Sequence, residues 1–399
     1  KKMKRSFVSS PSALNFVTAI LLCLSFHGNA QIKETGLPFI SNYPKSTYNA
    51  STQNWSVAQN SLGFLYFGNN DGLLEFDGQH WVTKALPAQT IVRSVLTAGD
   101  TIYTGSFEEI GYFSASGNGQ LEYRSYTELI PKPYRNFDEV WKIHRTGFGI
   151  VFQSFRYIFV YNNNRINVIK PKSSFLYSFY LNNKLVVFDK ETGMYELTPG
   201  GLLFMFNHPV FQRDEVRCVT ELSPGKLRIG TFTSGVFVFD GKNLIPWNDT
   251  LNSYLIEYGL FSGIKLSNGF YAFGTVRNGL YIADNNGVIF QQINRQKGLQ
   301  NNTILSLFED KRHNLWLGLD NGIDYIELNS PLSIYNYTYN LESTYAAIAY
   351  EGKLYVGTNQ GLYASELKSL TNRNLNNSFS LIKGTEGQVW SLAIIDNKL

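Results

Sequence analysis

The sequence repeats one pattern of apolar residues and glycines with a spacing of about 40 residues. In the clearest copy, an apolar strand at residues 303–309 is followed by a polar turn, a second strand at 315–318, an Asp-Asn-Gly turn and a third strand at 323–328. One three-stranded meander cannot bury both of its faces. The copy therefore predicts further copies against which it packs.

The other copies share an apolar strand that ends in Gly, a short turn, and a second Gly followed by apolar residues. The paired glycines are Gly68 and Gly72, Gly105 and Gly111, Gly230 and Gly235, Gly274 and Gly279, Gly318 and Gly322, and Gly357 and Gly361. Two degenerate copies surround Gln153 and Phe188. A repeat of this length with several strands per unit predicts an all-β fold, a β-propeller.

Residues 310–323 resemble the repeat of the two-component regulator propeller family. The similarity lies in Asp310, the Asn314-Leu315-Trp316 run, Gly318 and the Gly322-Ile323 pair, whereas His313 and Leu319 replace the Gly and Thr of the family pattern. The resemblance implies the periplasmic sensor half of a bacterial membrane regulator. Such proteins continue with a second propeller, a three-Tyr immunoglobulin-like domain, a membrane helix, and a histidine kinase or helix-turn-helix output.

Nine aligned segments open the expected innermost strands. They begin at Trp55, Arg93, Trp141, Tyr177, Arg217, Phe261, Leu305, Ala346 and Trp390, and the next residue is usually small. We expect small residues there because innermost strands crowd around the axis.

Seven of these openings precede the break at Asn329-Ser330-Pro331, so residues 31–330 are predicted to form seven four-stranded blades. Residues 38–43 would close the ring as the outer strand of the seventh blade, which removes an exposed edge. Residues 331–399 would begin a second propeller, with 332–337 as the counterpart of the closing strand. An eight-bladed ring ending near Lys383 is the alternative.

The first thirty residues predict export. Basic residues between Lys1 and Arg5 precede an apolar run at 13–26 and the small residues Gly28 and Ala30, so residues 1–30 read as a signal peptide removed before Gln31. The run is short for a lasting membrane span, and an uncleaved anchor is the alternative. We therefore expect a periplasmic protein that is membrane-anchored only through a segment beyond Leu399.

Charge and composition exclude several functions. The chain has 35 Lys and Arg against 31 Asp and Glu, but the first thirty residues hold four basic and no acidic ones, which leaves 31 against 31 and predicts no nucleic-acid partner. Cys218 is the one Cys after residue 30 and reads as a buried small residue. The histidines are scattered over different repeats, read as surface or loop residues and predict no metal site; they are His80, His144, His208 and His313. Adjacent carboxylates on a strand point to opposite faces and make no acid/base pair; they are Glu108 with Glu109 and Glu309 with Asp310. We therefore expect no catalytic residues and no cofactor.

The remaining candidates for function are the large residues that open six innermost strands. They come from six blades and would converge at one mouth of the ring: Trp55, Arg93, Trp141, Tyr177, Arg217 and Phe261. Aromatic faces and guanidinium groups suit a small polar or carbohydrate-like ligand. Packing of these side chains between blades is the competing interpretation.

Two functions remain open at this stage. The first is a non-catalytic ligand sensor of a transmembrane regulator, whose partner could be a second copy of the same chain in a homodimer. The second is a secreted propeller that binds or cleaves polysaccharide. The gene beyond Leu399 distinguishes them, because only the first requires a membrane span and an output domain.

Overall fold

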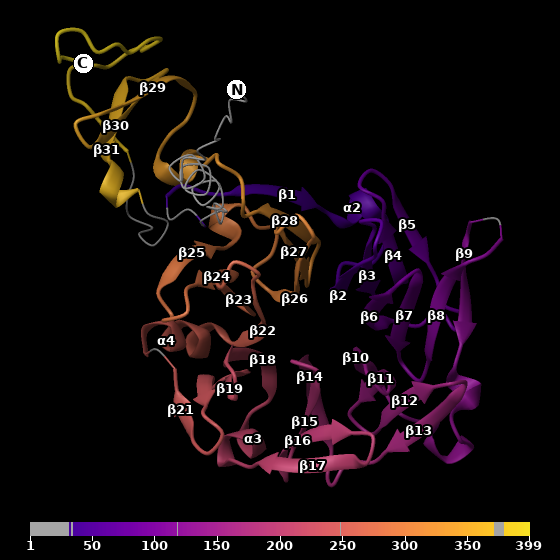
Figure 1. Ribbon diagram of the computed structural model, residues 1–399. Helices are drawn as coiled ribbons and strands as arrows, with labels where there is room; N and C mark the ends of the chain where they lie inside the picture. The colour runs from indigo at the N-terminus through magenta and orange to yellow at the C-terminus, as the bar shows by residue number, and fades with distance from the viewer. Residues whose placement is uncertain (1–31, 33–34, 118, 248, 371–378) are drawn as a thin grey trace, which may run out of the picture.

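The regular structure of the described part of the chain is mainly β-strand, arranged as four-stranded antiparallel sheets (Figure 1). The computed structural model describes residues 32, 35–117, 119–247, 249–370 and 379–399. The predicted signal peptide, residues 1–30, and its cleavage site before Gln31 lie outside the described residues. The prediction of an all-β propeller is confirmed.

The sheets follow one another along the sequence. The first holds β2 (Asn54–Gln59), β3 (Leu65–Asn69), β4 (Gly72–Phe76) and β5 (Trp81–Lys84). The second holds β6 (Val92–Ala98), β7 (Thr101–Ser106), β8 (Ile110–Ala115) and β9 (Leu121–Ser125). The third holds β10 (Val140–Thr146), β11 (Gly149–Ser154), β12 (Ile158–Asn162) and β13 (Arg165–Ile169). The fourth holds β14 (Phe175–Leu181), β15 (Lys184–Asp189), β16 (Gly193–Thr198) and β17 (Gly201–Phe206).

The remaining sheets repeat this order, with one exchange of a strand. The fifth holds β18 (Val216–Ser223), β19 (Lys226–Thr231), β20 (Gly235–Phe239) and β21 (Leu244–Pro246), and the sixth holds β22 (Leu260–Lys265), β23 (Tyr271–Thr275), β24 (Leu280–Ala283) and β25 (Ile289–Ile293). The seventh joins β26 (Ile304–Glu309), β27 (Leu315–Leu319) and β28 (Ile323–Glu327) to β1 (Phe39–Tyr43). The eighth holds β29 (Thr344–Tyr350), β30 (Lys353–Thr358), β31 (Leu362–Glu366) and β32 (Ser380–Leu381).

Short helices occur in the connections. They are α2 (Lys45–Tyr48), α3 (Pro209–Arg213), α4 (Asp249–Tyr258) and the 3-10 turns η1 (Thr127–Leu129), η2 (Lys132–Tyr134), η3 (Arg295–Lys297), η4 (Tyr337–Tyr339) and η5 (Leu367–Ser369). No helix in the described ranges is long and apolar enough to cross a bilayer.

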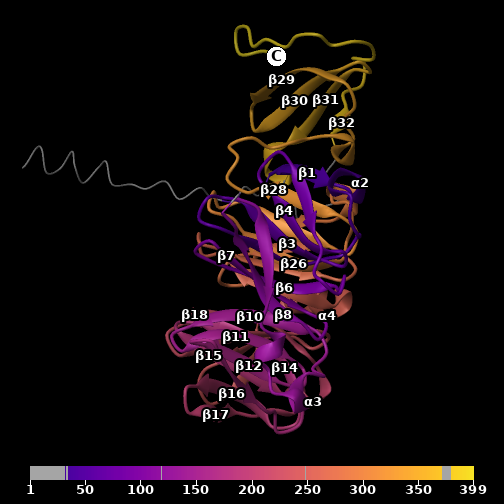
Figure 2. The same ribbon diagram turned by 90° about the vertical axis from the view of Figure 1, so that its right-hand side faces the viewer.

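The first seven sheets surround a common axis, with one strand of each sheet innermost. These strands are β2, β6, β10, β14, β18, β22 and β26, each contacts the next, and β26 returns to contact β2 (Figure 1). The eighth sheet lies beyond the edge of this ring, above β1 and β28 in Figure 2, and not between β28 and β2.

The expected closing strand is present. β1 pairs antiparallel with β28, from Phe39 opposite Glu327 to Tyr43 opposite Ile323. The ring of Tyr43 lies 5.7 Å from that of Trp316 and 5.5 Å from that of Trp81, so it joins the seventh sheet to the first. The donated strand thus covers an edge that would otherwise expose unpaired backbone groups.

The glycines of the repeat have two structural causes. A Cβ on Gly274 would lie 2.5 Å from Ser262 Oγ and 2.7 Å from Ile304 Cγ2 of the next sheet, so the first Gly allows neighbouring sheets to approach. Gly72, a second Gly, has φ +127°, and a Cβ there would lie 2.5 Å from Lys84 O. This conformation is open to Gly and strained for other residues.

The small second residue of the strand openings lies where innermost strands crowd together, as expected, and five of these residues, all Ser, also line the axial cavity. Three serine hydroxyls donate to a backbone oxygen of the next innermost strand: Ser94 to Val140 O at 2.7 Å, Ser262 to Ile304 O at 3.2 Å, and Ser306 to Asn54 O at 3.2 Å. Small size is needed because two strands meet at this seam. The third sheet departs from the rule with Lys142.

The eighth sheet follows the repeat only in part. Residues 332–337 form no strand in it, and Ile334 instead makes an isolated bridge with Leu37. The prediction that a strand begins at Trp390 is wrong, because residues 390–392 form no strand and no described strand pairs with them. The preceding residue, Val389, donates its N–H to Thr358 O at 2.9 Å. Val389 nevertheless approaches Gly357 as Val92 approaches Gly68, so it occupies the place of a next blade.

Candidate ligand-binding site at the ring axis

A cavity of about 650 Å³ lies within the seven innermost strands. Its lining begins at the strand openings and continues to Leu181, Glu221 and Lys265 at the opposite ends of their strands. All six residues singled out from the sequence line it: Trp55, Arg93, Trp141, Tyr177, Arg217 and Phe261. We call this set the collar.

The collar is continuous in its first half. The Arg93 guanidinium carbon lies 3.9 Å from the ring centre of Trp55 and 4.9 Å from that of Trp141. The centres of the two indoles are 5.8 Å apart at a nearly perpendicular angle of 79°. Arg93 therefore bridges sheets one and three through cation–π contacts.

The second half is built on Arg217. Its Nη1 donates to the Tyr177 hydroxyl at 3.0 Å, and its guanidinium carbon lies 4.5 Å from the ring centre of Phe261. Tyr177 in turn lies edge-on to Trp141, with ring centres 5.9 Å apart. The six side chains thus form one chain of contacts from the first sheet to the sixth.

Both arginines also have a carboxylate partner. Arg93 Nη2 lies 3.4 Å from Glu139 Oε1, and Arg217 Nη2 lies 2.5 Å from Glu215 Oε2. Burial lowers the pKa of Arg93, and Glu139 opposes this shift. The two interpretations of the sequence are therefore not exclusive, because the arginines line the cavity and also pack between sheets.

The collar contains polar hydrogens without acceptors. In the described part of the chain, Arg93 Nε and Nη1, Trp141 Nε1 and Arg217 Nε are buried and make no hydrogen bond. Trp55 Nε1, by contrast, donates to Asn70 Oδ1 at 2.8 Å. A buried donor without a partner costs about 1–3 kcal/mol, so the collar favours a state in which acceptors reach it after small side-chain movements.

Two residues behind the collar were missed from the sequence. Phe155 stacks on Trp141 with ring centres 5.6 Å apart, and the ring of Phe232 lies 5.0 Å from the Arg217 guanidinium carbon. Each directly follows the second strand of its sheet, as Asn70 does in the first sheet. This shared position is the signal that could have found them.

Lys142 and His144 lie deeper on β10 and were also missed. His144 is not the surface or loop residue expected from the sequence: it lines the cavity, and its Nε2 lies 2.9 Å from Ser178 Oγ. Burial, with a smaller contribution from Lys142, lowers the pKa of His144 to about 3, so the imidazole is neutral at pH 7. The signal for Lys142 was its size at a position where other sheets carry Ser or Cys.

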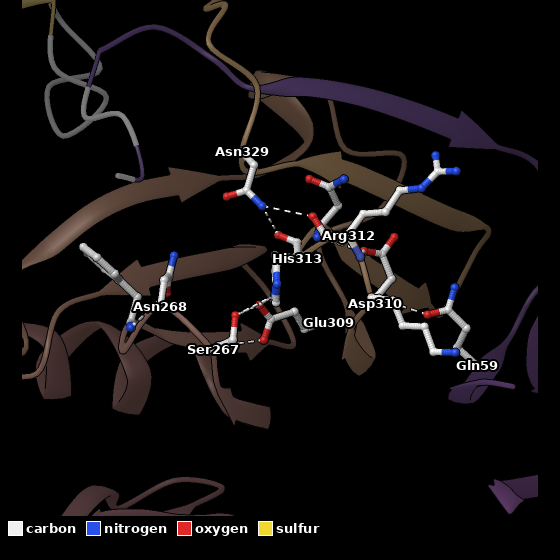
Figure 3. Close-up of polar contacts among 11 residues, drawn as sticks. Gln59, Ser267, Asn268, Glu309, Asp310, Arg312, His313 and Asn329 are labelled. Atoms are coloured by element: carbon white, nitrogen blue, oxygen red, sulfur yellow. Dashed lines mark hydrogen bonds and ion pairs between the residues drawn. The ribbon is translucent and has the colours of Figure 1, made fainter. Parts of the chain in front are cut away.

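A second polar cluster lies on the surface between sheets six and seven (Figure 3). Ser267 Oγ is 2.7 Å from His313 Nδ1 and 2.6 Å from Glu309 Oε1, and the same Nδ1 is 3.3 Å from Glu309 Oε1. A catalytic triad needs the Ser and the acid on opposite imidazole nitrogens. The cluster is therefore a contact between sheets and not a nucleophilic site.

The turn of the family motif is structural. Asp310 Oδ1 accepts from the backbone N–H groups of Arg312 and Asn314, both at 2.9 Å, and Oδ2 accepts from Trp316 Nε1 at 3.2 Å. His313 has φ +61°, which explains why the family pattern has Gly there.

The described ranges give little support for metal binding or for a nucleophilic thiol. No group of three or more His, Cys, Asp or Glu side chains lies close enough to hold a metal ion there. Cys218 is buried, and burial raises the pKa of its thiol to about 12, so it is not a reactive thiolate.

Ring and cavity together define a β-propeller with an axial cavity that aromatic and cationic side chains line. Residues 298–321 match the model of the two component regulator propeller family, which confirms the resemblance seen in the sequence. No curated protein matches the chain.

Solved structures share the fold at low identity. The extracellular domain of a protein from B. thetaiotaomicron described as hybrid two component system BT3049 is 18% identical with a TM-score of 0.65, over 90% of this chain and 51% of its own. The extracellular domain of BT4673 from the same organism, described as a one component system, is 17% identical with a TM-score of 0.59, over 90% of this chain and 50% of its own. This chain thus spans about half of each.

An enzyme shares the fold as well. A streptogramin B lyase is 14% identical with a TM-score of 0.54, over 72% of this chain and 97% of its own. At these identities the neighbours show the fold alone, so function must be argued from the cavity.

Proposed function

We propose that this chain is the ligand-sensing propeller region of an exported bacterial signalling regulator and that it binds a small polar or carbohydrate-like ligand in its axial cavity without catalysing a reaction. The observation that carries the proposal is the collar, in which side chains from six successive sheets meet at one cavity of about 650 Å³. The family match at residues 298–321 and the likeness to extracellular domains of two-component systems support the signalling context.

The cavity chemistry favours binding over cleavage of a saccharide. Indole and phenol faces offer area for a sugar ring, and guanidinium groups offer hydrogen bonds to its oxygens. Glycoside hydrolysis ordinarily needs two carboxyl groups across the scissile bond. Of the described residues that line the cavity, Glu221 is the one carboxylate.

The wider organisation is part of the same proposal. Residues 31–330 form the first ring and 331–399 the start of a second, in a periplasmic protein that is anchored by a segment beyond Leu399 and pairs as a homodimer. Ligand in the ring would alter how the ring packs on its neighbour and pass the signal by rigid-body movement.

Binding of a saccharide panel to the chain tests the proposal, with isothermal calorimetry and Trp fluorescence as readouts. The double variant Arg93→Ala/Arg217→Ala should bind at least about tenfold more weakly, because each Arg supplies a charge-assisted hydrogen bond. Arg165→Ala, an exposed position on the outer strand β13, is the matched control and should bind as wild type. A collar variant that melts and binds like wild type would refute the proposed site.

A further inference from the structure

The axial cavity has an excess of positive charge. Four cationic side chains line it, Arg93, Lys142, Arg217 and Lys265, against the single carboxylate of Glu221. The chain after residue 30 is balanced, with 31 basic and 31 acidic residues after the four basic ones of the first thirty are subtracted from 35. The excess of positive charge is therefore local to the cavity lining and not a property of the whole chain. A cleft lined by charges of one sign concentrates ligands of the opposite charge.

Lys142 is the cation that lacks a counter-ion. Arg93 and Arg217 are paired with Glu139 and Glu215. Lys142 Nζ lies 5.5 Å and 6.0 Å from the ring centres of Tyr177 and Phe179, and it makes no ion pair or hydrogen bond within the described part of the chain. Its ammonium group therefore faces the cavity with aromatic contacts alone.

The position of Lys142 in the repeat sets it apart from its equivalents in the other sheets. The equivalent residues of the other sheets are Ser56, Ser94, Ser178, Cys218, Ser262 and Ser306. Three of these serines donate a hydrogen bond to a backbone oxygen of the next innermost strand, whereas Lys142, which also lines the cavity, contacts the next strand through aromatic rings alone. A local departure from a repeat that gains no hydrogen bond or counter-ion is the kind of exception found at functional sites.

We infer that Lys142 binds an anionic group, a carboxylate or a sulfate, on the ligand of the axial cavity, and that the cavity therefore selects acidic over neutral saccharides. This inference rests on the proposed function, since it specifies the ligand class of the same site. The collar would hold the sugar ring while Lys142, one position further along β10, neutralises the charged substituent.

The protonation of Lys142 provides a readout that a merely structural residue would not give. Burial, followed by the charge of Arg217, lowers the pKa of Lys142 to about 8. A bound anion stabilises the ammonium form, so binding above pH 8 takes up a proton, and affinity falls by up to about tenfold per pH unit. The other ionisable groups around this part of the cavity are Arg93, His144, Tyr177, Tyr180, Arg217, Cys218, Glu221 and Lys265.

The test compares acidic sugars with their neutral partners by calorimetry on the chain. Galacturonate and galactose 6-sulfate are measured against galactose, and glucuronate against glucose, at pH 7 and pH 9 in two buffers of different ionisation enthalpy. Lys142→Ser introduces the residue that five other sheets carry, so the fold should tolerate it. Lys226→Met, at an exposed Lys on β19, is the control for loss of a positive charge.

We expect at least one acid to bind at least about thirtyfold more tightly than its neutral partner, with proton uptake at pH 9. Lys142→Ser should abolish this preference and the proton uptake, and Lys226→Met should abolish neither. Whether the uronates or the sulfate gain decides between the two anionic groups.

Equal binding of acid and neutral sugar, lost in Arg93→Ala/Arg217→Ala, would overturn the role of Lys142 and leave the proposed function intact. An acid preference that survives in Lys142→Ser would also overturn that role. A panel in which no sugar binds would count against both proposals.

Discussion

Replacement of Gly274 by Ala tests the physical basis of the repeat. The new Cβ would lie 2.5 Å from Ser262 Oγ and 2.7 and 2.8 Å from Ile304 Cγ2 and Cβ, so the sixth and seventh sheets must separate. Overpacking of this kind costs about 1–3 kcal/mol. The backbone of Gly274 is not in the left-handed region, so reduced freedom of the unfolded chain returns about 0.4–1 kcal/mol, and the net loss should be about 0–2.6 kcal/mol.

Thermal unfolding measures this loss against a matched substitution. Gly147→Ala is the control, because its Cβ would meet nothing within 4 Å and its backbone is also outside the left-handed region. We expect Gly274→Ala to melt several degrees lower and Gly147→Ala to melt as wild type or slightly higher. If Gly274→Ala melted as high as Gly147→Ala, the seam between sheets would not be the reason for the regular spacing of glycines along this chain.

Two further predictions concern closure and pH. Deletion of residues 31–43 should cause aggregation and unfolding at a lower temperature, because β28 loses its partner strand. Asp324, which is fully buried, also loses the 2.7 Å hydrogen bond from Asn42. Light scattering and circular dichroism measure both effects, and a soluble deletion variant with an unchanged melting temperature would contradict this prediction. The pKa of His144, lowered to about 3 from 6.5, makes the unfolded chain bind more protons between these values, so the free energy of unfolding should fall as pH drops from about 6.5 to 3. In His144→Gln, denaturant titrations over this range should give a shallower pH dependence than wild type, and an identical slope would refute the assignment.

Much of the fold could be predicted because the same pattern of apolar residues and glycines recurs along the sequence. The Gly pairs mark where sheets meet and where turns need positive φ, and the echo between residues 38–43 and 332–337 correctly identified the closing strand β1. The helix α4 was missed because it is a single insertion with no period to reveal it. Its evidence is local: Leu251 and Leu255 are buried one turn apart, and Asn252 accepts from Val236 N and donates to Val236 O and Trp247 O.

The sequence allowed us to predict the residues at the strand openings of the candidate site, but not the residues deeper in the cavity. Alignment of strand openings places Trp55 through Phe261 at one end of the ring, and the cavity gathers all six. The pairing of Arg93 with Glu139 could not be foreseen, since it joins residues 46 positions apart on neighbouring sheets. Lys142 was overlooked for a different reason: only the first residue of each strand opening was considered as a ligand contact, whereas in six sheets the second residue lines the cavity as well.

A crystal structure of the chain with the tightest-binding saccharide of the panel tests the central claim most directly. We predict ligand density on the ring axis, with a sugar face against Trp55 or Trp141 and oxygen atoms within hydrogen-bond distance of Arg93 or Arg217. Ligand density on the outer surface of the ring or on the eighth sheet, with the axial cavity holding solvent alone, would contradict it.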